Sequence, residues 1–126
     1  MNIRRTVTAT AIAAGLAVAP IGLAPPAGAV EKEFRVSGAD VDFGVERERG
    51  NYDVDLDIDD AAPRSKWRVT LWQNGKRFYK NVLTADSDGD VRGIDRTRPN
   101  TRGRDTFKVK VTRFGGGSKS RTLRVR

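Results

Sequence analysis

The stretch Tyr52-Asp-Val-Asp-Leu-Asp-Ile-Asp59 alternates strictly between apolar and acidic side chains. Successive side chains of a β-strand point to opposite faces, so this pattern predicts a strand with four apolar residues on one face and four carboxylates on the other. A helix would need its apolar positions to recur every three or four residues. The stretch therefore predicts a half-buried strand whose apolar side faces a core.

The same period of two continues through most of residues 30–126. Residues 67–71 alternate in this way and lead to Asn74-Gly75, a dipeptide that accepts the positive φ angles of a type I′ hairpin turn. Residues 107–111 also alternate and lead to the flexible glycine run 115–117. The expected inward residues are Tyr52, Val54, Leu56, Ile58, Trp67, Val69, Leu71, Phe107, Val109 and Val111.

Shorter segments complete the prediction of seven or eight strands. They cover residues 33–36, 41–45, 76–83, 90–94 and 123–125, with turn residues between most of them. Short strands at this spacing, without a helical pattern, favour an antiparallel sandwich over a barrel. We therefore predict an all-β fold, an antiparallel β-sandwich of immunoglobulin type.

A resemblance supports this expectation. The stretch from Trp67-Arg-Val-Thr-Leu-Trp through Leu83-Thr-Ala-Asp-Ser-Asp-Gly-Asp to Gly103-Arg-Asp-Thr-Phe-Lys-Val-Lys-Val resembles the C to F strands of bacterial immunoglobulin-like domains. The resemblance implies that Trp67 is the buried tryptophan of strand C and that Phe107 takes the early strand F position. The whole chain is similar to small secreted β-sandwich proteins of actinobacteria.

Residues 1–29 predict a secretion signal. Arg4 and Arg5 give a positive start, an apolar stretch covers residues 7–23, and Ala27-Gly28-Ala29 forms a small-residue cleavage site. We expect cleavage before Val30, one folded domain over residues 30–126, and a secreted, extracellular protein without membrane attachment. The arginine pair leaves the export route open between general secretion and the twin-arginine pathway.

The chain contains neither cysteine nor histidine. Disulfides, thiolate nucleophiles, histidine acid–base catalysis and ordinary zinc sites are therefore excluded. A small domain without disulfides needs one undivided core, which leaves no room for a large catalytic cavity. The serines have no histidine partner, and the glycine run joins two strands instead of opening a helix over a phosphate. We expect no enzymatic activity and no cofactor.

Charge is divided along the chain. Residues 30–60 contain 11 acidic and 4 basic side chains, whereas residues 61–126 contain 5 acidic and 18 basic ones. The aspartates of the strand at 52–58 and the lysines of the strand at 107–111 should project from opposite sheets, which predicts an acidic and a basic outer face. The residues expected on the basic face are Arg68, Lys108, Lys110 and Arg124, with Trp72 among them if its strand alternates without a bulge.

We interpret these five residues as a candidate binding face for an anionic polymer, such as a wall polymer or a nucleic acid, because an aromatic ring among cations offers stacking and charge together. Alternatives stay open. The charged faces merely solvate the sheets, or the protein is structural and self-associates through its opposed faces, or it inhibits another protein through the loop at 96–104. The aspartate row, in addition, could pair with basic residues across a strand.

Asp86, Asp88 and Asp90 have the carboxylate density of a calcium loop. An EF-hand needs glycine at the sixth position and glutamate at the twelfth, whereas here Gly89 is fourth and no glutamate follows. A polar turn leading into a strand is the interpretation that we retain. The three aspartates are kept only as metal candidates.

Overall fold

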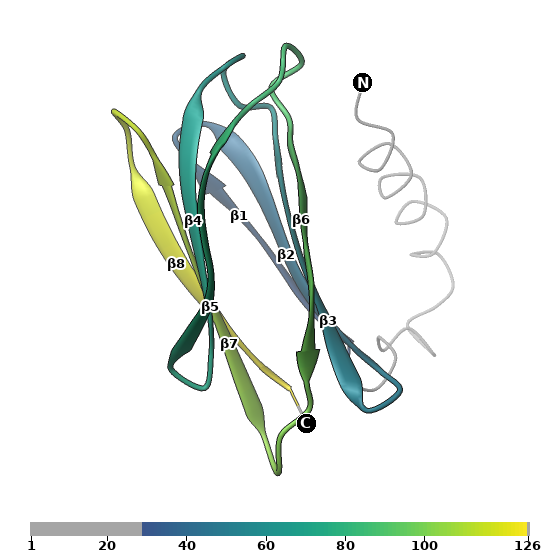
Figure 1. Cartoon of the computed structure of the whole chain (residues 1–126). Helices are drawn as coiled ribbons and strands as arrows, with labels where there is room; N and C mark the ends of the chain where they lie inside the picture. Colours follow the sequence, from purple (N-terminus) through teal and green to yellow (C-terminus); the bar gives the residue numbers. More distant parts are fainter. Residues whose placement is uncertain (1–28, 126) are drawn as a thin grey trace, which may run out of the picture.

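The computed structural model describes residues 29–125 and consists of two four-stranded antiparallel sheets that pack face to face (Figure 1). Sheet A contains, in order, β1 (Ala29–Val36), β2 (Ala39–Glu48), β3 (Asn51–Asp59) and β6 (Val91–Pro99). Sheet B contains, in order, β5 (Lys76–Thr84), β4 (Lys66–Gln73), β7 (Asp105–Arg113) and β8 (Ser118–Val125). The predicted signal lies outside the described residues, except for Ala29.

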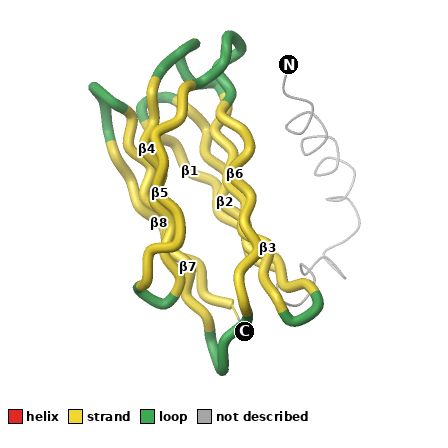
Figure 2. Tube along the Cα trace, viewed as in Figure 1, coloured by secondary structure: helices red, strands yellow, loops and turns green. Residues whose placement is uncertain are grey.

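The predicted all-β antiparallel sandwich is confirmed, with eight strands in the described part of the chain. Figure 2 shows only strands and loops there, and the described residues include no helix long and apolar enough to cross a membrane. All ten residues that were expected to point inward are buried. The alternation of apolar residues therefore identified the core-facing side of β3, β4 and β7.

The strand order differs from that of a constant-type immunoglobulin domain. Trp67 is buried at the start of β4, and Phe107 is buried near the start of β7. Sheet A, however, begins with the meander β1-β2-β3, whereas the constant-type immunoglobulin sheet brings together its first, second, fifth and fourth strands. The sandwich architecture is thus shown without that particular connectivity.

The two-residue hairpin turns have the positive φ angles that their sequences predict. Asn74 and Gly75 have φ angles of 50° and 83°, the pair of positive values that a type I′ turn requires. The same pair occurs at Ser37-Gly38 between β1 and β2 and at Arg49-Gly50 between β2 and β3. These two-residue turns fix the pairing register, and with it the face on which each side chain lies.

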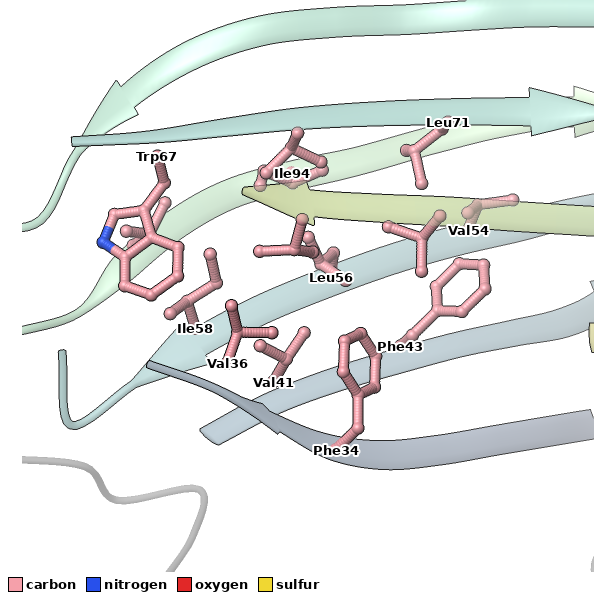
Figure 3. Packing of buried hydrophobic residues seen from close by; sticks show 14 of the residues in the cluster. Phe34, Val36, Val41, Phe43, Val54, Leu56, Ile58, Trp67, Leu71 and Ile94 are labelled. Atoms are coloured by element: carbon pink, nitrogen blue, oxygen red, sulfur yellow. The ribbon is translucent and has the colours of Figure 1, made fainter. Parts of the chain in front are cut away.

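One core fills the space between the sheets (Figure 3). Trp67 is its largest fully buried side chain, and the indole Nε1 donates a hydrogen bond of 2.8 Å to Ser65 Oγ. Tyr52 and Phe107 meet edge to face across the sheets, with ring centroids 5.3 Å apart. Inward residues of both sheets are therefore packed against each other, and most of the charged residues are left on the outer faces.

The prediction of a loop at residues 96–104 was wrong for residues 96–99, which belong to β6. β6 continues to Pro99, with Arg96 opposite Val54 and Arg98 opposite Tyr52. The apolar alternation stops there because arginines take the inward positions, and they stack on aromatic rings of β5 at the edge of the sandwich. Arg96 lies 4.7 Å from the ring centre of Tyr79, and Arg98 lies 4.6 Å from that of Phe78.

Candidate binding face

The outer face of sheet B gathers cationic side chains. Within the described residues, it carries no carboxylate, because Asp105, the acidic residue of these four strands, faces inward and is buried. Hydroxyl side chains of β4, β7 and β8 lie between the cations. We call this surface the basic face; its cations are Lys66, Arg68, Arg77, Lys80, Lys108, Lys110 and Arg124.

The structure brings the five residues of the predicted binding face together on this surface. Trp72 of β4 lies directly opposite Lys108 of β7, and Lys110 lies opposite Thr70. Arg68 is in the same outward row of β4 as Trp72, and Arg124 is in the outward row of β8. Four positions of a contiguous sheet surface thus present positive charge around one half-buried indole.

A bulge lies beside Trp72, but it is in β5. The register shifts between Leu71, opposite Tyr79, and Trp72, opposite Arg77, so the extra residue belongs to β5 and β4 keeps its alternation. The shift also places Lys80 opposite Thr70, on the outer side. The basic face therefore gains two cations from β5.

Arg77 and Lys80 were missed by sequence reasoning. In a two-residue hairpin, counting residues outward from the Asn74-Gly75 turn pairs Trp72 with Arg77. Arg77 could therefore have been assigned to the basic face from the sequence. The same count without a bulge turns Lys80 inward. Only the extra residue of β5 brings it to the basic face, and the sequence contains no signal for that bulge that we recognise.

Two cations of the basic face rest on aromatic rings. Lys108 Nζ lies 5.2 Å from the ring centre of Trp72, and the Arg68 guanidinium lies 5.0 Å from that of Phe114. The negative faces of these rings attract cations and hold them in place. The charges on this surface are thereby partly ordered before any ligand arrives.

A hollow of about 310 Å³ opens on the basic face beside the β4–β5 turn. Trp72 and Lys108 line it together with Gly75, Thr106 and Thr122. It offers an aromatic surface, an ammonium group and two hydroxyls at one place. This combination suits a ring-shaped group that carries or adjoins an anion.

The rim of the hollow is held by hydrogen bonds of Asn74. Its Oδ1 accepts from the Thr106 N–H at 2.8 Å, and its own N–H donates to the Thr106 carbonyl at 2.7 Å. Asn74 Nδ2 donates to Asp105 Oδ1 at 2.8 Å. The hairpin turn and the start of β7 are therefore tied together beneath the hollow.

Asp105 is the anchor of this network. Its carboxylate also accepts from Gln73 Nε2 at 3.3 Å, from the Thr101 N–H at 3.1 Å and from the Thr101 hydroxyl. Burial by itself raises the pKa of Asp105, but the hydrogen bonds from Thr101, Asn74 and Gln73 together outweigh it and lower the pKa. Sequence reasoning missed this residue because a lone aspartate after a loop looks like a surface charge.

The metal candidates Asp86, Asp88 and Asp90 lie close together, with one carboxylate oxygen from each within 4.8 Å of the others. Asp86 Oδ1 accepts from the backbone N–H groups of Asp88 and Asp90, each at 2.9 Å, and the bond from Asp90 is the largest cause of the lowered Asp86 pKa. Asp90 Oδ2 accepts from Arg92 at 2.8 Å. These contacts are those of a polar turn that leads into β6.

The outer face of sheet A has the opposite charge. Its carboxylates lie opposite one another in several pairs, such as Glu46 with Asp53 and Asp55 with Asp95. Glu48 shares a hydrogen bond with Asp53, and this bond, followed by the Asp53 charge, raises the Glu48 pKa. We call this surface the acidic face; its carboxylates are Glu31, Glu33, Asp40, Asp42, Glu46, Glu48, Asp53, Asp55, Asp57 and Asp95.

Basic residues directly across a strand were one expected source of neutralisation for the aspartates of β3 and their neighbours. The structure shows such pairing at only some positions. Arg35 of β1 lies opposite Asp40 and forms an ion pair with it at 3.4 Å. The residues directly opposite Asp53 and Asp55 in β2 and β6 are acidic or neutral. The acidic face therefore keeps a large excess of carboxylates over cations.

No protein-family model matches this chain, and no curated protein matches it significantly. The class of protein is therefore defined by the fold and the surface alone. It is an eight-stranded antiparallel sandwich whose two outer faces carry opposite charge.

Proposed function

We propose that the protein is a secreted, non-enzymatic module that binds a phosphodiester polymer, either a polymer of the cell envelope or extracellular nucleic acid, through its basic face. The observation that carries this proposal is the composition of the outer face of sheet B. Seven cations, an indole and several hydroxyls share a surface on which the described residues place no carboxylate.

The spacing of the cations suits a polymer better than a single small anion. Outward residues of one strand are roughly 7 Å apart, and neighbouring strands are roughly 5 Å apart, so the charges form a grid instead of converging on one point. A chain of phosphates that crosses this grid meets several cations and releases the counterions of each phosphate. Affinity should therefore depend strongly on salt and weakly on polymer sequence.

The hollow beside Trp72 adds a contact of another kind. A base or a sugar ring placed there stacks on the indole while Lys108 and the hydroxyls of Thr106 and Thr122 face its phosphate. Stacking contributes to affinity without releasing counterions. The two contributions can therefore be measured separately.

The test uses the purified protein with two fluorescent probes, oligothymidylate and poly(glycerol phosphate), over a range of salt concentrations. The variant Lys108→Gln/Lys110→Gln should bind both probes more weakly, and the slope of log affinity against log salt should be shallower by about one unit for each lysine removed. Trp72→Ala should weaken binding of oligothymidylate with little change in slope. Poly(glycerol phosphate) has no ring to stack on the indole, so its affinity should change little in Trp72→Ala, which separates stacking from charge.

The matched control is Glu31→Gln/Glu33→Gln, which removes two exposed charges from the acidic face. It should keep full affinity for both probes. This control and the double lysine variant should melt within a few degrees of the unmodified protein, because exposed charges contribute little to stability. An affinity independent of salt, or an equal loss in the control, would show that the basic face is only solvated surface.

A further inference from the structure

The two charged faces lie on opposite sides of the same sandwich. Each is the outer side of a four-stranded sheet, with the core between them. Within one molecule they are kept apart by the two sheets, whose backbones are roughly 10 Å from each other. Between two molecules, the acidic face of one can reach the basic face of the next.

We propose that a second copy of this chain is a partner of the acidic face, and that copies stack head to tail, with sheet A of one molecule on sheet B of the next. This goes beyond the proposed function, which assigns a ligand to the basic face only. The argument rests on charge complementarity between two surfaces of one chain.

The acidic face gains from such contact. Glu46 opposite Asp53 places like charges at neighbouring positions of the sheet, an arrangement that is unfavourable by itself. Cations of a second copy reduce this repulsion. Like charges are also close together on the basic face, because Lys80 and Lys110 flank Thr70 on its two sides. Carboxylates of a second copy reduce the repulsion between them.

The two faces also fit in size and shape. Both are made of four strands of eight to ten residues, and both are open sheet surfaces without a covering helix in the described part of the chain. From strand spacing and rise, each face measures roughly 20 Å by 27 Å, so a stacked pair buries on the order of 1,000 Å² in total. That area is at the lower end for specific complexes and predicts a weak, reversible contact.

The contact does not close on itself. It joins different surfaces of the two copies, so a stack of any length still ends in one free acidic face and one free basic face. The stack therefore grows with protein concentration, and an anionic polymer competes with the acidic face of the neighbour for the same basic face. Bound polymer should shorten the stacks.

The test is sedimentation velocity on the purified protein at low and high salt. The average sedimentation coefficient should rise with concentration at about 0.01 M salt, where charges act over about 30 Å, and should return to that of a monomer near 1 M, where they act over about 3 Å. Association that persists at high salt would point instead to pairing of edge strands such as β1 or β8 and would overturn the proposal.

Two variants make the test specific. One removes charge from the basic face, with Arg68→Gln, Lys108→Gln and Lys110→Gln; the other removes charge from the acidic face, with Glu46→Gln, Asp53→Asn and Asp95→Asn. Each variant alone should stay monomeric. An equimolar mixture should form dimers and nothing larger, because the intact acidic face of the first binds the intact basic face of the second.

The outcomes separate this proposal from the proposed function. The acidic-face variant retains every cation of the basic face, so it should bind oligothymidylate at least as tightly as the unmodified protein does. If the protein binds the polymer but stays monomeric at low salt, only the stacking proposal is contradicted. The stacking proposal is also contradicted if an equimolar mixture of the two variants stays monomeric. If the protein stacks but has no affinity for the polymer, only the proposed function is contradicted.

Discussion

At the scale of single residues, Asp105 shows how a buried charge holds a surface site in place. Its carboxylate is held by hydrogen-bond donors from Gln73, Asn74 and Thr101. A buried charge is costly unless such bonds replace its hydration. The bonds link three segments at the end of the sandwich, and the hollow next to Trp72 opens above them.

Asp105→Asn is expected to lower the free energy of unfolding by about 1 to 3 kcal/mol at neutral pH, because an amide cannot accept all of these bonds and leaves a buried donor unsatisfied. The lowered pKa of Asp105 sets the pH dependence. Its contribution to stability is complete above about pH 4, the ordinary value of an unfolded aspartate, and is lost as the pH falls through the lower native value. Urea denaturation at both pH values measures the difference.

The control is Asp95→Asn, the same substitution at an exposed position of β6. It should change the free energy of unfolding by no more than about 0.5 kcal/mol at either pH. A cost for Asp105→Asn that is equally small, or that grows below pH 4, would contradict the role given to the carboxylate.

At the scale of secondary structure, local alternation predicted most of the sandwich. The four apolar residues of β3 and the three of β4 were assigned to the buried side because strand geometry leaves no other choice. Asn74-Gly75 marked a hairpin because both residues accept positive φ angles. What local pattern does not contain is the partner of each strand, so the order of the sheets remained open.

The candidate site, like the fold, was predicted in the parts that depend on local alternation. Five residues of the basic face follow from alternation in β4, β7 and β8. Lys80 depends on the bulge in β5, and the hollow depends on how the β4–β5 turn meets the start of β7. Both are products of pairing between strands that are distant in sequence, and neither leaves a mark in the local pattern.

Leu56→Ala tests the packing of β3 against the core. Leu56 is 1% exposed and lies among side chains of both sheets, as Figure 3 shows, so truncation leaves a cavity. We expect a loss of about 2 to 5 kcal/mol in the free energy of unfolding. Val82→Ala is the control, since Val82 of β5 is 45% exposed and should cost less than about 0.5 kcal/mol. Chemical denaturation that gives equal costs would contradict the assigned core.

At the scale of the whole molecule, the separation of charge is the main property of this protein. The net charge of the full chain is +8, yet this sum hides two surfaces of opposite sign. A single value for net charge would predict repulsion between copies at neutral pH. Faces of opposite sign predict attraction in one orientation and binding of polyanions on one side only.

The two faces should respond differently to pH. Lysine and arginine keep their charge to about pH 10, and the chain has no histidine, so polymer affinity should be flat between about pH 5 and 9. The acidic face loses charge as its carboxylates take up protons. Glu48 should do so first, because its hydrogen bond with Asp53 and the Asp53 charge raise its pKa above the ordinary value of about 4.3.

Stacking should therefore weaken as the pH falls toward about 4, while polymer binding persists to the same pH. The sedimentation coefficient at low salt and the anisotropy of labelled oligothymidylate, measured on the same samples, distinguish the two. Circular dichroism at each pH confirms that the sheets remain folded. If stacking at low salt were as strong at about pH 4 as at neutral pH in folded protein, the acidic face would have no part in association, and the contact between copies would have to lie elsewhere on the molecule.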